Sequence, residues 1–150
     1  MTKEEIRERL GLMTPEDFLQ KKVLPAREHI RNSLGREHYE EVVSSGMGTG
    51  RTTEMLLSAA EFLTTKENDN QDVVIAAHTL AYASRLAGDL RQMLQRLGRS
   101  DAGTRVVARS FQLRADRHHP DWKKVWFRDH YYHSPRLGPH VEKPTTAEAP

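Results

Sequence analysis

The stretch Ser45-Gly46-Met47-Gly48-Thr49-Gly50-Arg51-Thr52-Thr53 decides the predicted fold of this chain. Its closely spaced glycines let backbone N–H groups turn inward toward an anion, because glycine has no Cβ atom to hinder that arrangement. A short apolar pair, Val42-Val43, precedes the stretch, and an apolar helical pattern runs from Glu54 to Leu63 after it. A strand, a glycine-rich loop and a helix in this order are typical of a phosphate-binding loop.

The spacing agrees with the pattern G-x-x-x-x-G-K-[ST], in which Ser45 takes the first position and Gly50 the last glycine. Arg51 stands where lysine is usual; its guanidinium is larger and planar, yet it can still bind a phosphate at two points. Thr52 supplies the hydroxyl that normally contacts a metal ion. The simpler alternative is a glycine-rich turn between any strand and helix. The predicted phosphate-binding residues are Ser45, Gly46, Gly48, Thr49, Gly50, Arg51, Thr52 and Thr53.

Further strands and a helix are predicted downstream of the loop. The β-branched apolar run at 72–79 indicates a buried strand, and spacings of three and four between apolar residues indicate a helix over 80–97. Two more strands are predicted at 104–111 and 124–129. Strands that alternate with helices favour a small α/β fold, with a mostly parallel sheet of about four strands between helical layers. We therefore expect a three-layer α/β fold of the phosphate-loop type, in which the sheet is the middle layer.

With these elements the chain resembles the P-loop NTPase superfamily, specifically the first RecA-like lobe of helicase- and terminase-type ATPases, from about Glu41 to about His130. The resemblance implies that the loop binds ATP together with Mg²⁺. It also implies that Asp129, at the end of an apolar strand, holds the metal with Thr52. Many members have a glutamate after this aspartate, whereas here His130 follows. Histidine can act as a base near neutral pH, so His130 is the candidate catalytic residue and we expect slow hydrolysis at most.

Two other functions stay open. The recognisable lobe is short and shows no arginine finger or second lobe, so a protein partner or a second copy would have to complete the site. One alternative is a structural or assembly protein, such as a virus could encode, that kept the fold and lost the nucleotide. The other is a nucleic-acid-binding module.

The distribution of charge motivates the nucleic-acid alternative. The net charge is +2, but it is unevenly distributed: the first part of the chain is acidic, and residues 85–136 are basic, with 12 basic and 5 acidic residues. Arginine suits phosphate backbones, and aromatic residues such as Trp122 and Tyr131 lie among the arginines and could stack on bases. The simpler alternative is that the charges of this region lie on a solvent-exposed helix face and at strand edges. The candidate DNA or RNA contacts are Arg91, Arg105, Arg109 and Arg114.

The regions outside the lobe carry no recognised chemistry. Residues 1–36 are predicted to form a helical N-terminal arm, with N-caps at Thr2 and Thr14, a kink or split at Pro25 and an end at Gly35. The lobe itself is assigned to residues 37–135. Residues 136–150 are rich in proline and threonine and predict an extended or flexible tail.

The composition of the chain indicates in which compartment the protein is expected. No run of about 18 apolar residues is present, so no membrane span is expected. The first residues lack the apolar core of a signal peptide, and cysteine is absent, which favours the cytoplasm or an assembled particle. Four histidines lie close together at the C-terminal end of the lobe, but without cysteine a zinc site is not favoured. These histidines are His118, His119, His130 and His133.

Overall fold

A computed structural model of the chain describes residues 1–45, 48–111, 120–129 and 145–148. Its centre is a sheet in the order β2-β1-β3-β4, in which β4 is Thr145–Glu148. Strands β2 (Val106–Ser110) and β3 (Val125–Arg128) pair in parallel with β1 (Val73–Ala77) on its two sides. The predicted mixed α/β fold with a mostly parallel sheet is confirmed, and all three parallel strands fall where the sequence predicts them.

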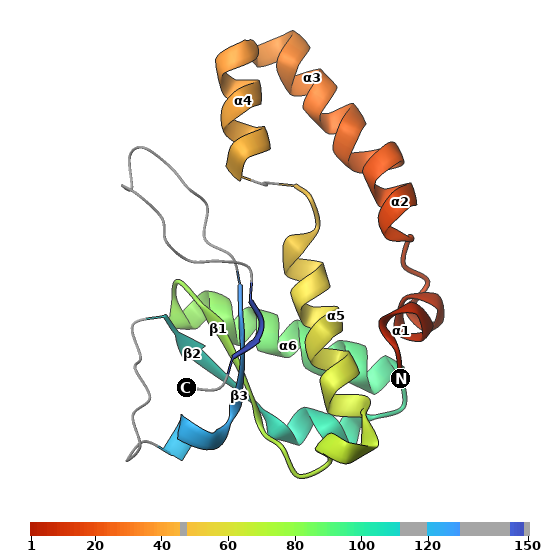
Figure 1. Ribbon diagram of the computed structural model, residues 1–150, viewed down its shortest axis with the longest axis vertical. Coiled ribbons are helices and arrows are strands. Elements are labelled where there is room, and N and C mark those ends of the chain that lie inside the picture. Colours follow the sequence, from red (N-terminus) through yellow and green to blue (C-terminus); the bar gives the residue numbers. More distant parts are fainter. Residues whose placement is uncertain (46–47, 112–119, 130–144, 149–150) are drawn as a thin grey trace.

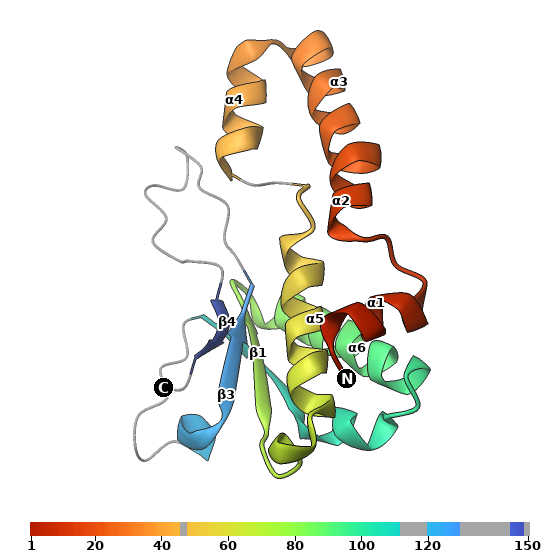
Figure 2. The same ribbon diagram turned by 45° about the vertical axis from the view of Figure 1, so that its right-hand side comes forward.

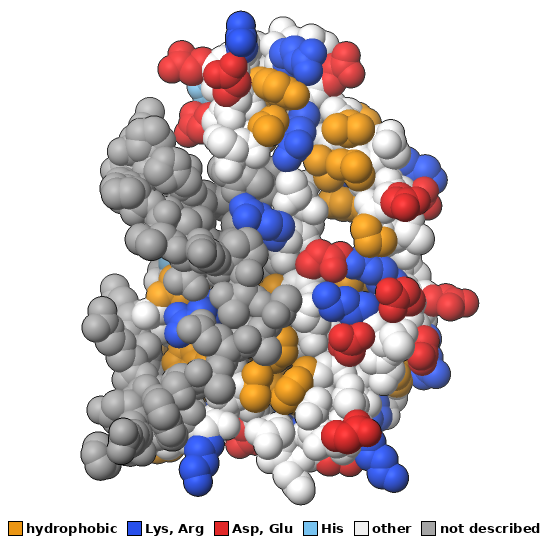
Figure 3. Space-filling model, viewed as in Figure 1, with side chains coloured by type: hydrophobic (Ala, Val, Ile, Leu, Met, Phe, Trp, Pro, Cys, Tyr) orange, Lys and Arg blue, Asp and Glu red, His pale blue; other side chains and the backbone are white. Residues whose placement is uncertain are grey.

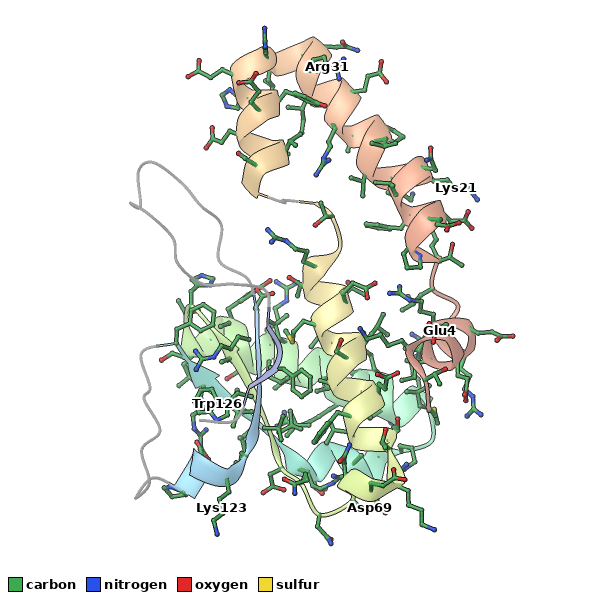
Figure 4. All side chains as sticks on the ribbon, viewed as in Figure 1. Glu4, Lys21, Arg31, Asp69, Lys123 and Trp126 are labelled. Atoms are coloured by element: carbon green, nitrogen blue, oxygen red, sulfur yellow. The ribbon has the colours of Figure 1, made fainter. Side chains whose placement is uncertain are left out.

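Helices pack on one face of this sheet. Helix α5 (Arg51–Thr64) and helix α6 (Leu80–Arg96) share a buried cluster with β1, and helix α1 (Lys3–Leu10) packs on α5. The opposite face carries a second, smaller cluster of Val74, Ala76 and Trp126 to which no described helix contributes. Figure 4 shows Trp126 beside β3 on the side away from α5. Within the described residues the sheet thus has one helical layer, rather than the two that a three-layer fold requires.

Local signals explain why α6 forms where it does. The Thr79 side chain accepts a hydrogen bond from the Tyr82 backbone N–H and so caps the start of the helix. Leu86, Leu90 and Leu94 recur every four residues and are all buried against the sheet. Gly98, with φ of +75°, follows the helix in the left-handed conformation.

In the structure the helical N-terminal arm continues to Ser45, and its residues 15–45 form a hairpin that stands away from the sheet (Figures 1 and 2). Its first limb is continuous: α2 (Pro15–Phe18), a π-helical segment η1 (Leu19–Val23) and α3 (Leu24–Leu34). The π-helical segment ends two residues before Pro25, the residue at which a kink or split is predicted. Gly35 (φ +91°) reverses the chain into α4 (Arg36–Ser45). The guanidinium of Arg31 (Figure 4) lies 4.6 Å from the centre of the Tyr39 ring and joins the two limbs.

Three short 3₁₀-helical segments complete the described structure: η2 (Lys66–Asn68), η3 (Ser100–Arg105) and η4 (Pro120–Lys123). Segment η2 leads from α5 toward β1, and η3 leads from α6 into β2. None of the helices in the described ranges is long and apolar enough to cross a lipid bilayer.

The structure corrects the element predicted before the glycine loop, and it adds a strand within the predicted tail. Val42 and Val43 lie in α4, so a helix and not a strand precedes the glycine loop. A two-residue apolar run is compatible with a helix or a strand. A strand at Val42-Val43 could not pair with β1, because β2 and β3 already occupy the positions on its two sides. In addition, Thr145–Glu148 of the predicted flexible tail form β4, which pairs antiparallel with β3. The outer edge of β3 offers unpaired backbone groups to any extended segment nearby.

Candidate functional site

The carboxyl ends of the parallel strands and the N-terminus of α5 meet at one edge of the sheet. Alternation along β3 directs Phe127 and Asp129 toward α5, and Trp126 and Arg128 toward the other face. The rings of Phe62 on α5 and Phe127 lie edge to face, with their centres 5.9 Å apart. This contact packs the C-terminal part of α5 against β3.

Thr52 and Asp129 meet at this edge. The Thr52 hydroxyl donates a hydrogen bond of 2.8 Å to Oδ1 of Asp129. The Asp129 backbone N–H donates to the carbonyl oxygen of Ala76 at 2.8 Å, which ties the residue to β1. Asp129 is 4% exposed. The two residues predicted to hold a metal ion therefore lie side by side, Thr52 in the first turn of α5 and Asp129 directly after β3.

The glycine loop leads directly into α5. Gly48 and Gly50 have φ angles of +75° and +80°, a region that favours glycine. The Gly50 carbonyl accepts from the Glu54 backbone N–H at 2.9 Å, which is the first hydrogen bond of the helix. Arg51 and Thr52 are half-buried in the first turn, and Thr53 is exposed. Gly46 lies outside the described residues, and Ser45 is the last residue of α4.

The geometry of Thr52 and Asp129 is compatible with Mg²⁺. This ion usually takes one or two protein oxygens, and phosphate oxygens and water complete its six positions. A hydroxyl and a carboxylate at hydrogen-bonding distance supply such a pair. No group of three or more His, Cys, Asp or Glu side chains able to hold a metal occurs among the described residues. The helix N-terminus beside them favours negative charge.

Three of the four arginines predicted to contact nucleic acid have partners within the protein. Arg91 donates to the carbonyl oxygens of Gly103 and Val106, at 3.4 and 2.8 Å. Arg105 donates to the carbonyl oxygens of Leu63, Asn68 and Gln71 at 2.7 to 2.9 Å. These contacts fasten η3 to α6 and to the segment between α5 and β1, so both arginines have a structural role. Arg114 lies outside the described residues.

Arg109 belongs to a charged cluster beside the second face of the sheet. Asp121 is 1% exposed, and its carboxylate binds Arg109 Nε and Lys124 Nζ, each at 2.8 Å. Burial raises the pKa of Asp121, but the hydrogen bonds from Lys124 and Arg109 outweigh it and hold the pKa below its usual value. The cluster joins η4 to β2 and to the start of β3. Arg109, like Arg91 and Arg105, therefore has a structural role.

Arg128 does not interrupt the apolar face of β3. Its guanidinium lies 5.1 Å from the centre of the Trp126 ring, on the face of the sheet away from α5. The strand therefore presents Phe127 and Asp129 to α5 although an arginine stands between them. The candidate base His130, like His118, His119 and His133, falls outside the described residues.

One further feature borders the loop, and sequence reasoning missed it. A cavity of about 590 Å³ lies between the arm and the N-terminus of α5, and Thr49, Gly50 and Thr53 line it on the loop side. Arm residues line the other side, among them Leu12, Met13 and Phe18. No spacing pattern in the arm signals this cavity, because it forms only when the arm folds against the loop.

The chain matches no protein-family model, and comparisons with curated proteins and with solved structures find no match.

Proposed function

We propose that the protein binds a nucleoside triphosphate, with ATP and Mg²⁺ as the first candidates, at the edge where the glycine loop meets the end of β3. In this proposal the backbone N–H groups around Gly48 and Gly50 contact the phosphates, and Arg51 neutralises their charge. Thr52 and Asp129 hold the metal, which would offset negative charge on the phosphates. The chain would be a reduced relative of RecA-like ATPases, with little or no hydrolysis of its own.

One observation carries the proposal: the 2.8 Å hydrogen bond between the Thr52 hydroxyl and the Asp129 carboxylate. Seventy-seven positions separate the two residues in the sequence, and the resemblance to P-loop NTPases assigns both of them to the metal. A buried carboxylate beside a helix N-terminus and a glycine-rich loop is a suitable environment for a metal–phosphate pair.

The helix before the loop favours a second candidate function. Phosphate loops of this superfamily follow a strand, whereas here α4 precedes the glycines. The arm that contains α4 exposes several large apolar side chains, and Figure 3 shows hydrophobic side chains gathered on it. Such a surface suits contact with another protein. The second candidate is therefore an assembly protein in which the loop is an inherited turn; the exposed apolar side chains are Leu12, Met13, Leu19, Leu24, Leu34 and Val43.

Calorimetric titration of the full chain with ATP and with ADP, each with and without Mg²⁺, tests the first function. We expect Mg²⁺-dependent binding that Thr52→Ala abolishes and Thr52→Ser retains, because serine keeps the hydroxyl. Thr104→Ala is the matched control, since Thr104 is exposed on η3 and its hydroxyl donates to the carbonyl oxygen of Asp101 in the same segment. Absence of binding at millimolar nucleotide in a folded protein would reject nucleotide binding and leave the assembly role.

A further inference from the structure

The cavity between the arm and α5 has the size of a small-molecule site. Its volume of about 590 Å³ lies within the range of about 300 to 1,000 Å³ that is usual for ligand pockets. Figure 3 shows the surface hollowed between the arm and the body of the protein. The segment that joins α1 to α2 forms one wall, and the first turn of α5 forms the other.

Apolar side chains form the arm side of this cavity. Leu12 and Met13 are 37% and 40% exposed, although they lie next to the body of the protein. Phe18 reaches the loop itself: a Cβ atom placed on Gly50 would lie 3.1 Å from Cε1 of the Phe18 ring. The Thr14 hydroxyl accepts a hydrogen bond from the Asp17 backbone N–H and so caps the short helix that ends at Phe18.

Charged groups border the same cavity. Arg7 and Lys22 reach it from the arm, and Glu54 reaches it from α5 and forms an ion pair with Arg7. Two cations against one carboxylate give the cavity a net positive charge, which suits an anionic ligand. An aromatic ring, apolar walls and polar groups at the rim are the features that hold a planar heterocycle.

The cavity and the glycine loop share residues. Gly50 and Thr53 line the cavity, while Thr52, between them and Asp129, faces the sheet. Successive residues of a helix point about 100° apart, so the first turn of α5 presents Thr52 to the proposed metal and Thr53 to the cavity. A ligand whose phosphates lie at the N-terminus of α5 can therefore extend directly into this space.

We propose that this cavity binds the base and ribose of the nucleotide, with Phe18 against the base, while the loop holds the phosphates. This inference rests on the proposed function, and it adds that the N-terminal arm belongs to the ligand site. It explains why Leu12 and Met13 stay exposed beside an otherwise well-packed body. It also predicts that affinity depends on the base, which phosphate contacts alone would not produce.

The test compares ATP with inorganic tripolyphosphate, which carries the phosphates without base or ribose. Calorimetry with the full chain and Mg²⁺ should give ATP an affinity at least about tenfold higher, from stacking of the base. Phe18→Ala should weaken ATP by about tenfold and leave tripolyphosphate unchanged, and Phe18→Trp should retain ATP binding. Met13→Trp, which fills the cavity from an exposed position, should act like Phe18→Ala.

Control variants separate the two proposals. Leu34→Ala alters a 60% exposed arm residue that does not line the cavity, and it should change neither affinity. Thr52→Ala should weaken both ligands, because it acts on the metal and the phosphates. Equal affinities for ATP and tripolyphosphate, or equal losses for both in Phe18→Ala, would overturn the base site and leave phosphate binding intact. Failure of both ligands to bind the folded protein would overturn both proposals.

Discussion

The Thr52 hydroxyl and the Asp129 carboxylate form a 2.8 Å hydrogen bond that joins the first turn of α5 to the end of β3. Asp129 is buried, and its backbone is held by β1. A buried carboxylate needs hydrogen bonds or a cation to offset lost hydration. The Thr52 hydroxyl supplies one such hydrogen bond. The hydroxyl and the carboxylate are also the two oxygen ligands that the protein would offer to a metal ion.

Asp129→Asn should remove the Mg²⁺ dependence of nucleotide binding without unfolding the protein. An asparagine oxygen can still accept the hydrogen bond from Thr52, so the neutral variant keeps the geometry, whereas it loses the charge that attracts the cation. Titration with ATP at several Mg²⁺ concentrations measures the effect. Affinity in Asp129→Asn that still rises with Mg²⁺ as in the original protein would remove Asp129 from the proposed metal site.

Gly50→Ala should destabilise the protein by about 1–2 kcal/mol and weaken phosphate binding. Its φ of +80° is unfavourable for a side chain, and the new Cβ would press on Phe18. Gly50→Val should be more severe. Gly88→Ala is the matched control, because Gly88 lies inside α6 with no atom within 4 Å of the new Cβ, so it should stabilise by about 0.5–1 kcal/mol. Urea unfolding measures the stability of Gly50→Ala and of Gly88→Ala. If the two variants were equally stable, the result would argue against strain at Gly50.

Arg105→Ala should lower the free energy of unfolding by about 2–3 kcal/mol, since three backbone carbonyls lose a charged donor. Arg105→Lys should recover only part of the loss, because an ammonium group cannot reproduce the planar fork. Arg85→Ala alters an exposed arginine on α6 and should change stability by less than about 0.5 kcal/mol. If Arg105→Ala changed the free energy of unfolding as little as Arg85→Ala, these contacts would not stabilise the fold. Arg105 would then again be a candidate for contact with nucleic acid.

Asp121 should make stability depend on pH in the acid range. Its pKa is lower in the folded than in the unfolded protein, so the unfolded chain takes up a proton first as the pH falls. The contribution of Asp121 is therefore fully present above about pH 4, the unfolded value, and is lost as the pH falls toward the folded value. Asp121→Asn should reduce stability by about 1–3 kcal/mol at neutral pH, because Arg109 and Lys124 lose their shared partner.

Urea unfolding at pH 7 and pH 3 measures this linkage. The difference in stability between the original protein and Asp121→Asn should shrink at the lower pH. Asp101→Asn is a useful comparison, because Asp101 also has a lowered pKa but lies exposed beside Arg99, where water screens the pair. A difference between original protein and Asp121→Asn that stays constant with pH would contradict the ion-pair explanation.

The sequence by itself determined the elements with strong local patterns. Apolar spacing located α6, β-branched runs located β1 and β2, and capping threonines located the starts of α1 and α2. These patterns suffice because the period of apolar residues and the hydrogen bonds of a cap are set within a few residues of chain. The glycines of the loop and the threonine after them were likewise visible in the sequence.

Only the tertiary structure decided the rest. Val42-Val43 could form helix or strand, and the choice depends on which sheet positions other segments occupy. Pairing of Thr145–Glu148 with β3 depends on an edge that exists only in the folded sheet. The meeting of Thr52 with Asp129, and of Phe18 with Gly50, joins residues from separate elements. Such contacts arise from packing between distant segments, which no local pattern encodes.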